Sequence, residues 1–133
     1  MCIRDRVKET ARLEAAYDDS AGVTARFNKN VLTVLNRELD ADFDLDAFEH
    51  LAFYDAEQER IDIRLRSLAD QVVTVRGLDL EVPFLVGEEM RTELSCKFTR
   101  ESLERSYADS GLELVEFWTD ADEQFALSLA RGA

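Results

Sequence analysis

The spacing of hydrophobic residues changes once along the chain, near Phe48, and this change restricts the fold to a mixed α+β type. Before Phe48, apolar residues recur at intervals of three and four, the period of a helix with one buried face. Beyond it, apolar and polar residues alternate, the period of a half-buried strand. The helical set is Val23, Phe27, Val31, Val34 and Leu35.

Two helices are predicted in the N-terminal part. Residues 7–17 are helix formers without a breaker, and a second helix should run from an N-cap at Ser20 to about Leu39. The stretch 40–46 that follows has four alternating aspartates, which suggests a calcium loop. An EF-hand loop needs Gly at its sixth position and Glu at its twelfth, and here both positions hold other residues. Solvated acids and helix caps are the better interpretation.

Antiparallel strands arranged as a meander are predicted next. The extended segments, in chain order, are Ile61–Leu65, Val73–Val75, Leu78–Phe84 and Met90–Cys96. Gly77 marks a turn, and Pro83 indicates an edge strand because proline donates no hydrogen bond to a ladder. The chain should end with a helix between Thr99 and Gly111 and a β-hairpin, Leu112–Trp118 with Gln124–Ala130.

The charge of the chain excludes two classes of partner. Of 133 residues, 29 are acidic and 16 basic, giving a net charge of −13. Non-specific nucleic-acid binding and attachment to anionic membranes both need clustered basic residues. No apolar run approaches the ~20 residues of a membrane span, and no signal peptide is visible. We therefore expect a cytoplasmic protein that binds neither nucleic acid nor membrane.

Few residues of the kinds that reactive sites need are present. His50 is the only histidine, so no Ser-His-Asp or Cys-His arrangement is convincing. The two cysteines and this histidine lack the short spacings of a zinc site, so we expect no metal. Five glycines without a G-x-G-x-x-G pattern exclude a phosphate-cradling turn. No side chain is expected to act as a catalytic nucleophile.

Two polar patches remain as candidate binding residues. Tyr17 lies with two acidic residues at a helix junction, where a packing role is the alternative. Glu93 and Ser95 are two apart in an extended segment, so their side chains share one face. Together they could bind the N–H groups of a ligand ring, or they could form an ordinary solvent face. The stretch 27–30 on the second helix resembles a solvent face more than a site.

The first six residues, 1–6, look foreign to the fold. They resemble the translation of a transposon-end sequencing adapter; the alternative is an ordinary N-terminus with Asp5 as a helix cap. We expect residues 1–6 to be non-native and the native sequence to begin near Val7.

Several stretches, taken in order and spacing, together carry a resemblance to one family. They are YDDSAGVTARFNKN at 17–30, LNREL at 35–39, ADFDLDAFEH at 41–50, ELSCKF at 93–98, WTD at 118–120 and FALSLA at 125–130. In combination they resemble the histidine-specific, S-adenosylmethionine-dependent Nα-methyltransferases, which make hercynine on the route to ergothioneine. The resemblance covers nearly all of residues 7–130.

The resemblance implies that the chain is the C-terminal part of a monomeric α/β enzyme. That enzyme has a Rossmann-type methyltransferase domain with an inserted α+β substrate domain. Residues 7–97 would be part of the substrate-binding domain, and residues 98–133 the last helix and hairpin of the methyltransferase domain. The S-adenosylmethionine site would lie in the missing N-terminal part, so the chain alone should be inactive.

Site roles also follow from the resemblance, with L-histidine as the implied small-molecule substrate. Tyr17 matches a tyrosine that holds the α-amino acid end, and Glu93 and Ser95 match the pair that binds the imidazole ring. Ile63 stands where relatives often have methionine beside the ring, which puts the ring preference in question. Two alternatives stay open: a methyltransferase for another aromatic amino acid, and a free-standing binding module.

Overall fold

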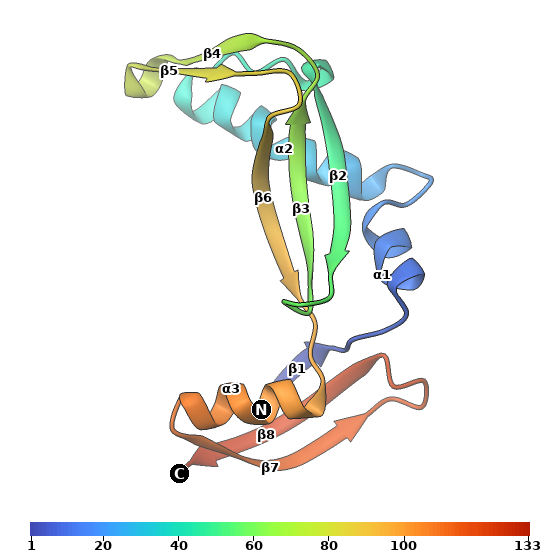
Figure 1. Ribbon diagram of the computed structural model, residues 1–133. Coiled ribbons are helices and arrows are strands. Elements are labelled where there is room, and N and C mark those ends of the chain that lie inside the picture. The colour runs from blue at the N-terminus through green and yellow to red at the C-terminus, as the bar shows by residue number, and fades with distance from the viewer.

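The computed structural model describes residues 1–133 (Figure 1). Its three helices and its strands from Arg60 onward follow the predicted order, whereas the strands at Cys2–Asp5 and Phe48–Asp55 were not predicted. The helices are α1 (Thr10–Tyr17), α2 (Val23–Leu39) and α3 (Arg100–Asp109). The strands are β1 (Cys2–Asp5), β2 (Phe48–Asp55), β3 (Arg60–Ser67), β4 (Gln71–Val75), β5 (Leu80–Phe84), β6 (Glu89–Cys96), β7 (Leu112–Thr119) and β8 (Phe125–Gly132). The expected α+β class is confirmed.

The middle strands are antiparallel as expected, but they do not form one continuous meander. Their sheet has the order β2-β3-β6, and β4 and β5 form a separate two-stranded hairpin. After β3 the chain leaves the sheet, forms the β4-β5 hairpin and returns to the sheet as β6. Strand β3 is therefore the central strand. Strand β2 was not predicted, because its sequence FEHLAFYD lacks a clean alternation of apolar and polar residues.

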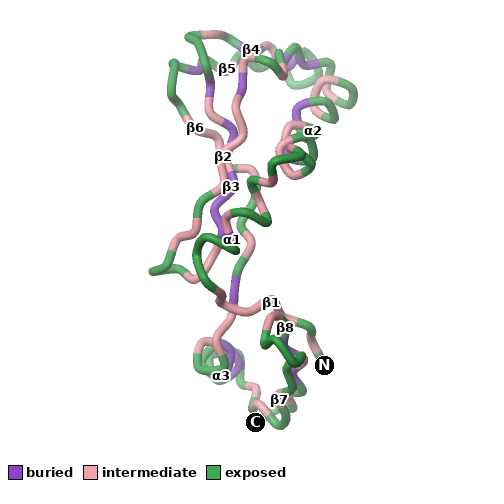
Figure 2. Tube along the Cα trace, turned by 90° about the vertical axis from the view of Figure 1, so that its right-hand side faces the viewer, coloured by how far each residue is buried: buried purple, intermediate pink, exposed green.

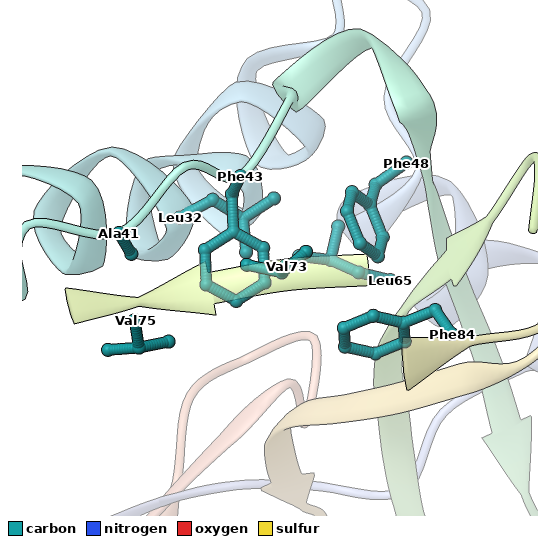
Figure 3. Close-up of a cluster of buried hydrophobic side chains, with 8 residues drawn as sticks. All are labelled: Leu32, Ala41, Phe43, Phe48, Leu65, Val73, Val75 and Phe84. Carbon is teal, nitrogen blue, oxygen red and sulfur yellow. The ribbon is translucent and has the colours of Figure 1, made fainter. Parts of the chain in front are cut away.

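The main core lies where the hairpin β4-β5 and helix α2 meet one end of this sheet (Figure 3). Its buried side chains are Leu32, Ala41, Phe43, Phe48, Leu65, Val73, Val75 and Phe84. The three phenylalanine rings pack with tilted or edge-on geometry, at centroid distances of 5.3, 5.9 and 6.4 Å, which is the range favoured by aromatic pairs. The separate hairpin therefore closes the core that a simple meander would leave open.

The start of α2 differs from the prediction. Ser20 is not its N-cap; the cap position is Gly22, which has a left-handed φ of 65°. That turn brings the Asp19 carboxylate to the backbone N–H groups of Val23 and Thr24, at 3.1 and 3.0 Å. Glycine adopts this conformation without strain. Asp19, rather than Ser20, therefore accepts hydrogen bonds from the first free N–H groups of the helix.

The aspartates of the stretch 40–46 form turns, caps and ion pairs. Asp42 accepts a hydrogen bond from the Thr74 N–H at 2.7 Å and pairs with Arg76 at 2.9 Å. Asp44 accepts from the N–H of Asp46 at 3.0 Å. No group of three or more His, Cys, Asp or Glu side chains is arranged to hold a metal ion.

A second, smaller sheet with the order β1-β8-β7 carries α3 (Figure 1). A capping box between Thr99 and Ser102 starts α3, and Gly111 follows the helix with a left-handed φ of 69°, both as expected. Residues 2–5 form β1 against β8.

The two sheets lie in separate parts of an open molecule (Figure 2). The solvent-accessible area is 8359 Å², against roughly 7,100 Å² for a compact protein of this mass. Only 19 of the 133 residues are buried. Much apolar surface is therefore exposed on α2 and on the smaller sheet. No helix is both long enough and apolar enough to cross a membrane.

Candidate functional site: one face of the β2-β3-β6 sheet

An irregularity in strand β6 determines which way the candidate residues face. Arg91 lies opposite Arg64, but the next pair is Glu93 with Ile63, so Thr92 is an extra residue, a β-bulge. In a regular ladder Arg91 and Glu93 would share a face. The bulge instead puts Glu93 and Ser95 on the face of Ile63, toward helices α1 and α2. Their expected common face is confirmed.

Tyr17 and Ser95 meet on this face. Tyr17 is the last residue of α1, and its hydroxyl lies 2.7 Å from Oγ of Ser95. Lys97 joins them: its side chain is fully buried, and Nζ donates to the Tyr17 hydroxyl at 2.7 Å and to Ser95 Oγ at 2.8 Å. Lys97 was not among the predicted site residues, and its place two residues after Ser95 is the only sequence signal that points to it.

The positive charge of Lys97 persists despite its burial. Burial lowers the pKa of an ammonium group, but hydrogen bonds to Asp5 and to the Tyr17 hydroxyl outweigh it, and the pKa of Lys97 is raised. Nζ also pairs with Asp5 at 2.8 Å. The three N–H groups of the Lys97 ammonium are thus bonded to Asp5, Tyr17 and Ser95.

Glu93 lies farther along the same face, at a cavity of about 230 Å³. The cavity is lined by Phe27, Asn28, Asn30, Val31, Thr92 and Glu93. Glu93 is exposed and takes part in none of the ion pairs of the sheet. Tyr17 and Ser95 do not line this cavity. The structure therefore brings Tyr17 and Ser95 into contact and places Glu93 on the same face of the sheet, at a different cavity.

Ile63 lies beneath the candidate residues. Only 2% of it is exposed, and it packs with Leu13 and Ile61 in a small core against which Tyr17 also packs. Its direct partner across the ladder is Glu93. Ile63 therefore belongs to the buried layer that supports the strand backbone and the Tyr17 ring.

His50 links the two helices that border the site. Its Nδ1 lies 3.0 Å from Nδ2 of Asn28, and its Nε2 lies 2.8 Å from the carbonyl oxygen of Tyr17. An amide nitrogen only donates, so Nδ1 accepts and Nε2–H donates to Tyr17. Asn28 is 7% exposed and also donates to the Arg64 carbonyl. The view of stretch 27–30 as a plain solvent face was therefore wrong at Asn28.

The opposite face of the sheet carries a closed network of charges. Asp62 is almost fully buried and accepts from Arg64 at 2.7 and 2.9 Å, and it pairs with Arg91 at 3.0 Å. Glu89 pairs with Arg64 at 2.8 Å and Arg66 at 2.7 Å. The Arg64 hydrogen bonds outweigh the effect of burial and hold the pKa of Asp62 below its ordinary value. Hydrogen bonds from Arg66 and Arg64 likewise lower the pKa of Glu89.

These residues do not provide a site for S-adenosylmethionine. A turn that binds such a nucleoside needs free backbone N–H groups at a helix start. The one helix entered through a glycine is α2, and its first N–H groups, those of Val23 and Thr24, already bond to Asp19. The sheet face described above presents hydroxyl and carboxylate oxygens, which accept hydrogen bonds from N–H groups.

Comparison with known proteins places the chain in a class of enzymes. The family described as histidine-specific, S-adenosylmethionine-dependent methyltransferase matches residues 3–132. The chain belongs to this histidine-specific methyltransferase family.

Two curated relatives are similar over nearly the whole chain. A histidine N-alpha-methyltransferase of Mycolicibacterium smegmatis is 57% identical over 126 residues, and one of Mycobacterium tuberculosis is 53% identical over 126 residues. Each match covers 95% of this chain and 39% of the relative. The chain thus spans about two fifths of the length of these relatives.

Proposed function

We propose that this chain supplies the histidine-binding part of an enzyme that methylates the α-amino nitrogen of L-histidine. The observation that carries the proposal is the set of polar groups on one sheet face. The hydroxyls of Tyr17 and Ser95 lie 2.7 Å apart, and the unpaired carboxylate of Glu93 faces the same side. Family membership and the two relatives support the same reaction.

Each group has a role that its chemistry suits. The Glu93 carboxylate accepts a ring N–H, and such a charge-assisted bond contributes roughly 1.5–3 kcal/mol. Ser95 binds the second ring nitrogen, and the Tyr17 hydroxyl binds the α-amino acid end. Ile63 supports the wall beside the ring. A site that satisfies a ring N–H strongly rejects a ring that lacks one.

The contribution of this chain to catalysis is positioning. Held at both ends, the substrate keeps its amine in one orientation, and such fixation removes much of the entropic barrier of a bimolecular reaction. S-adenosylmethionine would supply the methyl group from a site in the region that the relatives have outside the match. We propose three successive methylations to hercynine, within ergothioneine biosynthesis, by a monomeric cytoplasmic enzyme.

A chimeric enzyme tests the proposal. In the M. smegmatis relative, the matching segment is replaced by this chain, and methylation of histidine is measured with and without Glu93→Ala. We expect an active chimera, in which the substitution lowers kcat/KM for histidine by about 10- to 100-fold. Glu81→Ala, on the exposed strand β5, is the matched control and should leave turnover unchanged. Unchanged histidine turnover in the Glu93→Ala chimera would remove the assigned role.

A second candidate substrate is another aromatic amino acid. It rests on Ile63, the isoleucine opposite Glu93, which stands where relatives often have methionine beside the ring. Turnover of phenylalanine and tryptophan in the same chimera decides between the substrates. A third possibility, a free-standing binding module, requires histidine binding by the 133-residue chain itself; isothermal titration should detect none.

A further inference from the structure

We propose that Lys97 is a positioning residue that fixes the direction in which the Tyr17 and Ser95 hydroxyls donate. This inference rests on the proposed function and extends it to a residue outside the expected set. The Lys97 side chain has no exposed surface, and Nζ contacts both hydroxyl oxygens, at 2.7 and 2.8 Å. The lysine thus closes a triangle with two groups that themselves lie 2.7 Å apart.

Counting protons in this triangle defines what it offers a ligand. An ammonium group only donates, so both hydroxyl oxygens accept from Lys97. The bond between the two hydroxyls uses one hydroxyl proton. One proton therefore remains free to donate, and the hydroxyl that donates within the pair keeps one lone pair free to accept.

The resulting set of donors and acceptors matches an amino acid with a ring N–H. In one arrangement Ser95 donates to Tyr17, and the Tyr17 O–H is left for a carboxylate. Ser95 then keeps an acceptor for one ring N–H while Glu93 accepts the other, an arrangement that suits a protonated imidazole ring with N–H groups at both nitrogens. Without Lys97 the two hydroxyls could donate in additional directions, so the ligand would have to order them on binding.

The lysine contact can be tested in the chain without any substitution. The sequence contains three lysines, Lys8, Lys29 and Lys97. In a chain labelled with ¹⁵N at lysine Nζ, we expect one ammonium signal with slow hydrogen exchange, because Lys97 alone has a fully buried side chain that bonds two hydroxyls. The signal is assigned in the native chain, from nuclear Overhauser contacts between its ammonium protons and the Tyr17 ring, whose centroid lies 4.6 Å from Nζ. If all three ammonium groups exchange rapidly, or the slow signal is another lysine, the proposal is overturned.

The functional consequence is measured in the chimera with M. smegmatis sequence. Lys97→Met should raise KM for histidine about tenfold or more, the effect of losing a charged hydrogen-bond donor, while kcat changes by less than about threefold. Lys29→Met, on α2 and outside the triangle, should change neither value. A fall in kcat at constant KM would indicate a structural role only and would overturn the proposal.

The two hypotheses fail in different ways. An inactive chimera with native Lys97 contradicts the proposed function, and the role of Lys97 toward histidine is rejected with it. An active chimera in which Lys97→Met keeps the native KM contradicts the inference about Lys97 alone. The lysine spectrum decides the geometry even if Lys97→Met does not fold, because it uses the native chain.

Discussion

The two faces of the β2-β3-β6 sheet use the same strands for different purposes. The outer face is the one turned away from helices α1 and α2, and the helix face is the one turned toward them. On the outer face, the carboxylates of Asp62 and Glu89 are held by arginines at 2.7–3.0 Å. On the helix face, Glu93 of the same strand β6 has no ion pair, and the Tyr17 and Ser95 hydroxyls retain a donor for a ligand. One face satisfies its charges internally, whereas the other leaves polar groups available.

A single extra residue separates these two roles. Without the bulge at Thr92, the ladder would place Glu93 opposite Asp62, on the outer face among the arginines. There its carboxylate would be one more partner in the network. With the bulge it faces the cavity beside α2. Bulges are frequent next to binding sites for this reason: they turn a side chain without ending the strand.

The largest effect on stability should come from a substitution in the main core, which lies at one end of the helix face. Leu65 is fully buried in the main core. Leu65→Ala should lower the free energy of unfolding by about 3 kcal/mol, because it removes buried methyl groups and leaves a cavity. Val115→Ala, on the exposed surface of β7, should cost less than about 1 kcal/mol. Urea denaturation of both variants checks this, and equal losses would mean that this core is not the stabilising one.

A smaller effect is expected from the charged face, and it depends on pH. Asp62→Asn should cost about 2 kcal/mol at neutral pH, because two arginines lose a carboxylate partner. The pKa of Asp62 is lowered from its ordinary 3.8 in the folded chain. Ionised Asp62 therefore stabilises the fold fully at pH values above its ordinary pKa of 3.8. This contribution disappears as the pH falls through the lower pKa of the folded state.

Denaturation curves from pH 7 to pH 2 give the comparison directly. The native chain should lose stability steeply in acid, whereas Asp62→Asn should show a shallower loss. Parallel curves for the two proteins would show that the network does not stabilise the folded state.

Much of this arrangement was predictable from local sequence patterns. The helix α2, the alternation in β3 and the capping of α3 at Thr99 all follow from side-chain period and cap chemistry, which act over a few residues. The shared face of Glu93 and Ser95 followed from the same alternation. These features were predictable because neighbouring residues determine them.

The rest depends on contacts between residues far apart in the chain. The pairing of β3 with β6 rather than β4 is decided by the core that the hairpin covers, and no local pattern encodes it. The bulge at Thr92 leaves no mark in the sequence, since it is a mismatch between two strands. Lys97 was not predicted as a site residue, because its hydroxyl partner Tyr17 is 80 residues away in the sequence. The Asp19 cap was missed because Ser20 is an equally good capping residue type.

The most direct test of the division between the two faces compares Glu93→Gln with Asp62→Asn. In the chimera with the M. smegmatis relative, both variants are measured for urea stability and for KM with histidine. Glu93→Gln should change stability by less than about 0.5 kcal/mol and raise KM about tenfold or more. Asp62→Asn should show the reverse, lower stability with a nearly unchanged KM. If Glu93→Gln instead loses stability and keeps its KM, the helix face is not the histidine site.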